Sequence, residues 1–158
     1  MKTQVKQVPT AAPAEPTTDS VDGLAVATPS GNRAVPTRLD LVEPLPGLPG
    51  RTAYDLQALD DLGVLFSIRS NPLDGPQIRL FLVSPHVFFP SYAPTIPADA
   101  LGDAHSDDEV LFVVVRPADA EGEVPTANLL APLVVDPATG RCAQVVLDGD
   151  HPLRAPVG

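Results

Sequence analysis

The chain has 158 residues, enough for one domain of ordinary size, and 20 of them are proline, more than twice the usual share of about 5%. Because proline lacks an N–H and fixes its φ angle, long helices are excluded over most of the chain, and with 4% aromatic residues and no Trp the core must be built from Val, Leu and Ala. The formal net charge of −10 argues against a nucleic-acid ligand, since such ligands bind through Lys and Arg.

The N-terminal part of the chain divides into two segments. Residues 1–23 are rich in Pro, Ala and Thr without periodicity, and we expect a disordered tail because so little apolar surface cannot offset the ordering entropy. Residues 24–38 include "LAVATPSGNRAV", which could form an edge hairpin that turns at Ser30-Gly31-Asn32. Residues 39–158 are expected to form the compact domain.

The compact domain is expected to consist of short strands joined by Pro- and Gly-rich loops. "EPLPGLPG" (43–50) is too punctuated for a helix or a central strand and predicts a shaped loop. "LGVLFSIR" (62–69) places Leu62, Val64, Phe66 and Ile68 on one face, and "QIRLFLV" (77–83) has the same period of two. The turn residues 71–76 between them predict a hairpin.

Three further strand signals follow. "VLFVVVR" (110–116) is a continuous β-branched run that favours a strand buried on both faces, and 133–135 and 144–147 flank the turn signal "DPATG". Only "IPADALGDA" (96–104) predicts a short helical turn, with Pro97 near its start and Gly102 near its end. The pattern predicts an all-β fold, a small compact barrel or sandwich with one short helical turn.

The residues that usually carry catalysis or metal binding lack companions. Cys142 is the single cysteine, so an internal disulfide and a cysteine-based zinc site are excluded, and its strand pattern favours an inert core residue. His105 with Asp107, Asp108 and Glu109 could hold a divalent ion, but a solvated acidic loop is the commoner meaning of such a run. Phosphate-binding loop motifs are absent. We expect no catalytic residue, cofactor or metal.

No segment indicates export or membrane insertion. The N-terminus lacks an apolar stretch of signal-peptide length, and the longest apolar run, 129–135, is far short of the ~20 residues that span a bilayer. A single cysteine suits a reducing compartment. We expect a cytoplasmic protein.

Two polar and aromatic motifs are candidates for partner binding. "SPHVFFPSY" (84–92) gathers Phe88, Phe89 and Tyr92 around Pro90, either to cover the core or to anchor a partner, since large rings dominate interface energetics. Thr126 and Asn128 precede the apolar run 129–135, and the favoured interpretation is that they satisfy backbone groups at a turn.

These motifs resemble those of the FliW family of bacterial flagellar assembly factors. The resemblance covers residues 39–155 and rests on "PLPGLPG" (44–50), "SPHVFFPSY" (84–92), "TANLLAPLVVD" (126–136) and "QVVL" (144–147), in the family's order. It implies a small β-barrel without catalytic activity. It also implies two partners, the translational repressor CsrA, whose repression of flagellin synthesis such proteins relieve, and flagellin itself. We take Phe88, Phe89, Pro90, Tyr92, Thr126 and Asn128 as the candidate partner-binding residues.

The net charge of the expected compact domain favours a basic partner. Residues 39–158 carry six arginines against seventeen carboxylates, a net charge of −11. Docked on a basic RNA-binding protein, such a domain would lower RNA affinity without covering the RNA site.

The chain departs from the family pattern at Arg51, Ser67 and Ser91. The departures leave open a chaperone that binds flagellin only. A second alternative is a small-molecule-binding barrel, or a hydrolase that uses Cys142 or a histidine; it would require a ligand-sized interior cavity.

Overall fold

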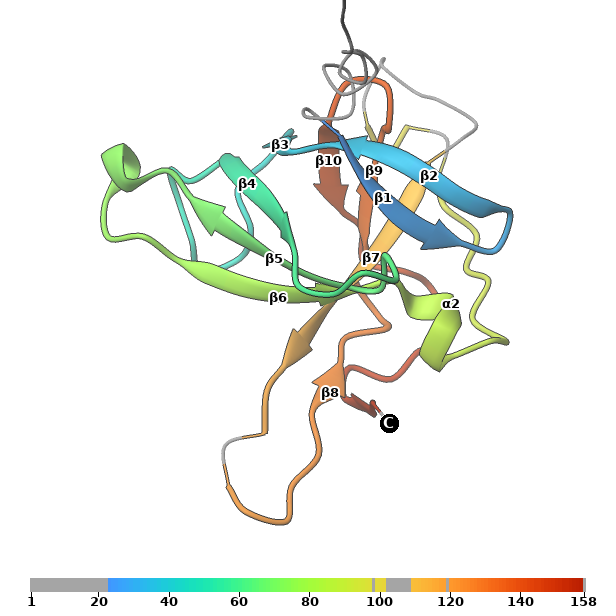
Figure 1. Ribbon diagram of the computed structural model, residues 1–158. Coiled ribbons are helices and arrows are strands. Elements are labelled where there is room, and N and C mark those ends of the chain that lie inside the picture. The colour runs from blue at the N-terminus through green and yellow to red at the C-terminus, as the bar shows by residue number, and fades with distance from the viewer. Residues whose placement is uncertain (1–22, 98, 102–108, 119, 158) are drawn as a thin grey trace, which may run out of the picture.

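The computed structural model describes residues 23–97, 99–101, 109–118 and 120–157. The predicted disordered tail lies outside these residues, apart from Gly23. The elements, drawn in Figure 1, are β1 (Gly23–Thr28), β2 (Gly31–Pro36), β3 (Arg38–Leu41), β4 (Ala53–Ala58), β5 (Leu65–Ser70), the 3-10 helix η2 (Pro72–Asp74), β6 (Arg79–Val83), α2 (Pro85–Phe88), β7 (Val110–Arg116), β8 (Thr126–Ala127), β9 (Leu133–Val135), β10 (Arg141–Gln144) and β11 (Ala155–Pro156).

Seven strands close into a barrel. The hydrogen-bonded order runs β7-β6-β5-β4-β3-β10-β9, and β9 pairs again with β7. All neighbours in this ring are antiparallel except β3 and β10, which are parallel. The short strands β8 and β11 extend from β7 outside the ring. The prediction of an all-β barrel is therefore confirmed, and closure leaves the ring without a free edge.

The inside of the barrel is filled by apolar side chains. Phe66 of β5 and Phe112 of β7 are both fully buried and meet edge to face, with ring centroids 5.3 Å apart. The predicted hairpin of β1 and β2 lies across the barrel in Figure 1 and contributes Val26 and Val35, both 0% exposed, to the same core. The hairpin forms its own two-stranded sheet beside the ring and is also part of the core.

The central strands follow the predicted alternation. β5 and β6 pair in the predicted hairpin, with Phe66 opposite Leu82 and Ile68 opposite Leu80, which places their apolar side chains on the inner face. Leu62 does not belong to this face: it precedes the strand and is 74% exposed. β9 and β10 also form the predicted hairpin, but β10 lies at Arg141–Gln144, three residues before the predicted 144–147.

The helical turns of the described chain begin at or near a proline. The turn predicted at 96–104 lies partly outside the described residues, and of its described part Pro97 and Ala100 close a turn with an N···O distance of 3.1 Å. Regular helix appears in "SPHVFFPSY" instead, where Pro85 occupies the first turn of α2. At η2 the Asn71 side chain accepts a hydrogen bond from the Leu73 N–H at 2.9 Å.

One glycine is required by the close approach of β3 and β10. Gly140 has a φ of +84°, and a Cβ at this position would collide with the carbonyl oxygen of Arg38. Its own carbonyl accepts a hydrogen bond from the Asp40 N–H at 3.0 Å, beside the one parallel pairing in the ring. The "DPATG" turn therefore needs glycine for both conformation and space.

We predict that Leu133→Asp abolishes folding. Leu133 is 0% exposed in the barrel core, so the substitution buries an unpaired charge at a cost of about 4 kcal/mol or more, a large part of a typical stability. Thermal unfolding followed by circular dichroism should show no cooperative transition. Val146→Asp is the matched control just after β10, because Val146 is 73% exposed and this variant should unfold like the natural chain.

Candidate partner-binding site

The structure brings the two predicted partner-binding segments together. Phe88, Phe89 and Tyr92 pack on a second apolar cluster on the outer side of the barrel. The buried members of this cluster are Val83, Val113, Ala127, Leu129 and Ala155. Since Ala127 and Leu129 flank Asn128, the aromatic motif and the Thr-Ala-Asn motif form one region although about 35 residues separate them in the chain.

Tyr92 ties the two segments together. Its hydroxyl donates a hydrogen bond to the carbonyl oxygen of Leu129 at 2.6 Å, and its ring meets that of His151 edge to face, with centroids 5.7 Å apart. Burial raises the pKa of Tyr92 to about 12, because the phenolate would be poorly solvated. Much of the Tyr92 side chain therefore serves the fold of this region.

Asn128 shapes the loop that enters β9, as the favoured interpretation had it. Its Oδ1 accepts hydrogen bonds from the N–H groups of Leu130 and Ala131 at 3.1 and 3.0 Å. Thr126 lies in β8, where it pairs with Arg116 on one side and Pro156 on the other. Contact of either residue with a partner stays a prediction.

The aromatic segment keeps part of its surface open. Phe88 and Phe89 are half-buried, Pro90 is exposed and Val87 is 44% exposed. Phe89 ends α2, and its N–H donates to the Pro85 carbonyl at 2.8 Å, so the exposed ring edges are held on a short rigid turn. Rigid aromatic groups of this kind are typical interface anchors because little conformational entropy is lost on binding.

The potential nucleophiles have structural roles. Cys142 is 1% exposed within the barrel core, and burial raises the pKa of its thiol to about 12. The Ser84 hydroxyl donates to the Ala27 carbonyl and lies 3.1 Å from Nδ1 of His86, so this pair fastens α2 to the β1 strand. These positions weigh against the hydrolase alternative, since neither group is prepared for attack.

The described part of the chain contains neither a cluster of metal ligands nor a membrane-spanning helix. Within it, no three His, Cys, Asp or Glu side chains are grouped so that they could hold a metal ion. Of the acidic cluster considered above, His105, Asp107 and Asp108 lie outside the described residues. None of the helices described is long and apolar enough to cross a membrane.

The three departures from the family pattern occupy different environments. Arg51 donates from Nη2 to the carbonyl of Pro76 at 3.0 Å and so links the 43–50 loop to the β5–β6 turn. Ser67 is 0% exposed, and its hydroxyl lacks a hydrogen-bond partner among the described residues. Ser91 is exposed beside the aromatic segment. Ser91 is the departure that lies closest along the chain to the candidate site.

Sequence reasoning missed two contributors to this region. His151 meets Tyr92 edge to face, and the carbonyl of Pro152 accepts a hydrogen bond from the Leu129 N–H at 3.0 Å. Both come from the C-terminal segment, about 60 residues beyond Tyr92. No local motif marks them, and only the fold places them here.

Several known proteins are similar to this chain. The family model described as "FliW protein" matches residues 31–157. Flagellar assembly factor FliW of Symbiobacterium thermophilum is 34% identical over 87 residues, which are 53% of this chain and 63% of that protein. Flagellar assembly factor FliW 2 of Desulfotalea psychrophila is 36% identical over 110 residues, 67% of this chain and 70% of the relative. The first match thus spans slightly less than two thirds of the relative's length.

The fold agrees with these similarities. A structure titled "Crystal structure of the flagellar assembly factor FliW" superimposes with a TM-score of 0.62 at 21% identity, covering 85% of this chain and 95% of that one. The architecture is that of a small closed β-barrel with an aromatic cluster on its outer side. The chain belongs to the FliW family of flagellar assembly factors.

Tyr92→Phe should lower the stability of the protein at neutral pH. It should also make the stability depend less on pH in the alkaline range. The variant loses the hydrogen bond to Leu129, worth about 1 kcal/mol. Because the folded pKa of Tyr92 is about 12 and its unfolded value is 10.0, the tyrosine's contribution is complete below pH 10 and is lost as the pH rises toward 12. Urea unfolding at pH 7 and pH 11 should show the gap between natural protein and variant narrowing; a gap independent of pH would contradict this.

Cys142 should resist thiol reagents while the protein is folded. Its burial and raised pKa leave almost no accessible thiolate at pH 8. We expect labelling by an aromatic disulfide reagent to proceed only as fast as the protein unfolds, and rapidly in 6–8 M urea, a range typical for full denaturation. Fast labelling of the native protein would contradict this prediction and support a reactive cysteine.

Proposed function

We propose that this protein acts in flagellar assembly as a regulatory binding protein and not as an enzyme. It binds the translational repressor CsrA in the cytoplasm and relieves repression of flagellin synthesis, and it binds flagellin as a partner-switching chaperone. The observation that carries the proposal is the packing of Phe88, Phe89 and Tyr92 from one family motif with Ala127 and Leu129 from the other in one outer cluster, which leaves part of the aromatic segment exposed. Membership of the family supports the same conclusion.

The net charge supports a specific way of acting on CsrA. A domain of net charge −11 held beside an RNA-binding surface adds negative potential there and disfavours RNA without covering its whole site. Such an effect is screened by salt, with a Debye length of about 10 Å at 0.1 M. Antagonism of RNA binding should therefore fall as the salt concentration rises.

A flagellin-only chaperone is the second candidate function. Ser91 is exposed next to Pro90 and Tyr92, where the family tends to have a carboxylate. Loss of a charge at the edge of the aromatic segment would weaken attraction to a basic partner while leaving the apolar anchor in place. Loss of CsrA binding with flagellin binding retained would identify this function.

Calorimetric titration of the full chain with CsrA from the same organism, with and without flagellin, tests the proposal. We expect binding to CsrA that flagellin abolishes. Phe89→Ala should weaken this binding about tenfold or more, as for an anchor residue, with little change in thermal stability. Leu73→Ala is the matched control, because Leu73 is 90% exposed on η2, away from the outer cluster, and should bind normally.

Three outcomes would contradict parts of this proposal. Unchanged affinity in a folded Phe89→Ala protein would reject the aromatic anchor. Binding of flagellin alone would leave the chaperone function. Failure to bind either protein would reject the proposal as a whole.

A further inference from the structure

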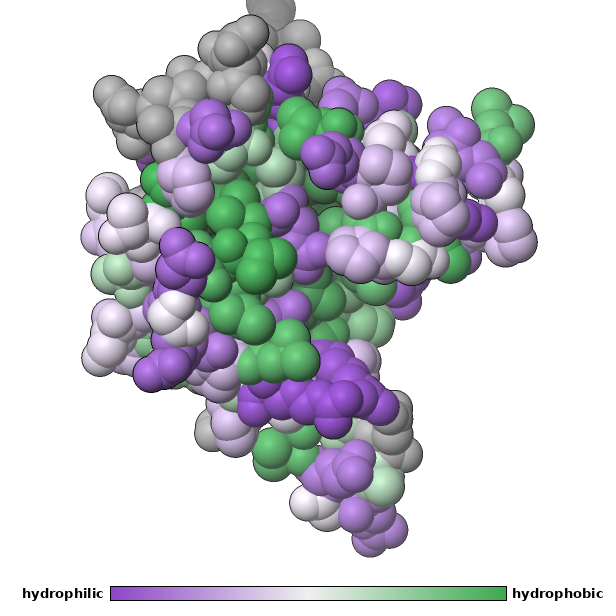
Figure 2. All heavy atoms as spheres, turned by 180° about the vertical axis from the view of Figure 1, so that it is seen from behind, coloured by the Kyte–Doolittle hydropathy of each residue, from purple (hydrophilic) through white to green (hydrophobic). Residues whose placement is uncertain are grey.

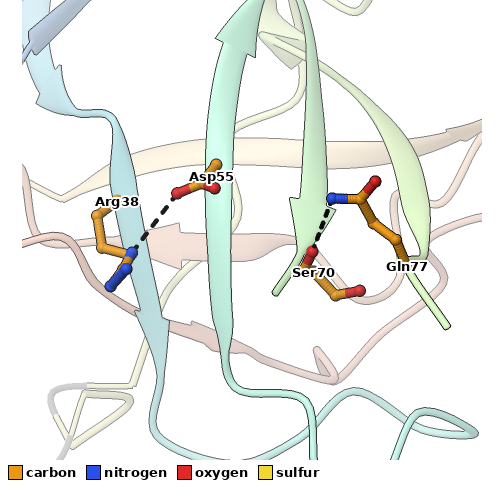
Figure 3. A network of polar contacts seen from close by, with 4 residues as sticks. All are labelled: Arg38, Asp55, Ser70 and Gln77. Atoms are coloured by element: carbon orange, nitrogen blue, oxygen red, sulfur yellow. Dashed lines mark hydrogen bonds and ion pairs between the residues drawn. The ribbon is translucent and has the colours of Figure 1, made fainter. Parts of the chain in front are cut away.

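The outer face of the barrel carries a row of arginines, although the chain as a whole is acidic. Strand register places Arg38 opposite Asp55, Asp55 opposite Arg69, and Arg69 opposite Arg79, so the four side chains cross strands β3 to β6 in one line. All four residues are exposed. Figure 3 shows Arg38 and Asp55 pointing toward each other from neighbouring strands, at an N···O distance of 3.5 Å. Three arginines and one aspartate make this row basic in a chain of net charge −10.

An apolar groove of 280 Å³ lies beside this row. Its lining is entirely apolar and consists of Leu59, Leu65, Phe66, Phe81, Leu82, Val83, Val115, Pro117 and Pro125. The groove adjoins the row directly, because the Arg79 guanidinium lies 4.8 Å from the centre of the Phe81 ring. Leu59 and Leu65 are each 40% exposed.

The groove continues the apolar outer face of the barrel, which the aromatic segment covers near α2. Val83 and Val115 line the groove and also belong to the outer cluster covered by Phe88, Phe89 and Tyr92. Beyond that cover, Leu65 on the outer face of β5 is 40% exposed. Exposed apolar side chains also gather between hydrophilic ones on the face turned away from Figure 1 (Figure 2).

Further arginines lie at the other end of the groove. Pro117 is shared with a second hollow of 290 Å³ that is lined by Arg116 and Arg154 together with Glu123. The apolar lining thus continues into guanidinium groups at both ends, Arg79 at one and Arg154 at the other. Guanidinium groups bind carboxylates with two parallel hydrogen bonds, so these ends favour acidic side chains.

We propose that this arginine-flanked groove is a docking surface for an acidic amphipathic segment of a partner protein. Apolar side chains of the segment fill the groove, and its carboxylates reach Arg79 and Arg69 on one side and Arg154 on the other. A nucleic acid fits less well because the lining offers no polar group to base edges and the net charge of −10 repels phosphates. The same net charge disfavours a second copy of this chain. The surface lies beside the aromatic segment of the proposed function but uses different side chains.

Binding of two designed peptides to the full chain tests the proposal. Both are fluorescein-labelled 15-residue peptides, a length of about four helical turns. In one peptide Glu and Leu are spaced to share one face of a helix, and in the other they are spaced to share one face of a strand. Fluorescence anisotropy should show at least one of them binding with a Kd of about 10–100 μM at low salt, a value in the range of weak peptide contacts. The same peptides with Lys in place of Glu, or Ser in place of Leu, should not bind.

Matched variants locate the site. Arg79→Glu should weaken binding about fivefold or more, whereas Arg141→Glu, the same charge change on exposed Arg141 of β10, should change it less than about twofold. Leu65→Ser should weaken binding, and Leu73→Ser should not. Circular dichroism confirms that each variant is folded, and Leu59→Ser replaces Leu65→Ser if the latter is not.

Each outcome of these experiments either supports or overturns the docking surface. Loss of binding in Arg79→Glu and Leu65→Ser with retention in both controls supports the docking surface. Absence of binding by either peptide at about 1 mM, which corresponds to about 4 kcal/mol, would overturn it, as would equal weakening by Arg79→Glu and Arg141→Glu. Concentration-dependent dimers abolished by Leu65→Ser, or binding of a single-stranded RNA oligonucleotide abolished by Arg79→Glu, would assign the surface to another occupant and also overturn it.

Discussion

The structure depends on the pairing of β7 with three other strands. It bonds to β6 along one side, while on its other side its first half pairs with β9 and its last residues with β8. The β7–β9 pairing closes the ring of seven strands, and the β7–β8 pairing starts the small extension outside it. A continuous run of β-branched residues suits this position, because both of its faces and both of its edges are used.

The candidate site follows from what β7 presents to the outside. Its inner residues, among them Phe112, belong to the barrel core, whereas Val113 and Val115 point away from it. An apolar outer face must be covered or left to bind something. Over Val113 the cover is made by the aromatic side chains of 88–92, which the hydrogen bond from Tyr92 to Leu129 holds in place. Val115 lies at the edge of this cover, and with Phe81 it lines the open groove. The same physical need therefore links the proposed anchor with the groove beside it.

Net charge and local charge carry different information about this protein. The excess of carboxylates describes the field that a partner meets at a distance and favours a basic partner such as an RNA-binding protein. Strand register then gathers arginines in one row, where at contact distance the surface has the opposite sign. Since salt screens the distant field more strongly than close contacts, the two kinds of interaction respond differently to ionic strength.

Sequence alone determined what depends on neighbours along the chain. The period-two pattern of 62–83, the β-branched run 110–116 and the turn residues before Arg141 identified the strands and an all-β barrel or sandwich, because alternation and turn chemistry are local properties. The choice of a barrel came from the family resemblance. The family motifs named the residues of the candidate site. Only the tertiary structure decided that 88–92 and 126–129 form one cluster, that His151 and Pro152 complete it, and that the 24–35 hairpin belongs to the core. Those contacts, like the arginine row and its groove, come from strand order and register, which bring together residues that no spacing along the chain relates.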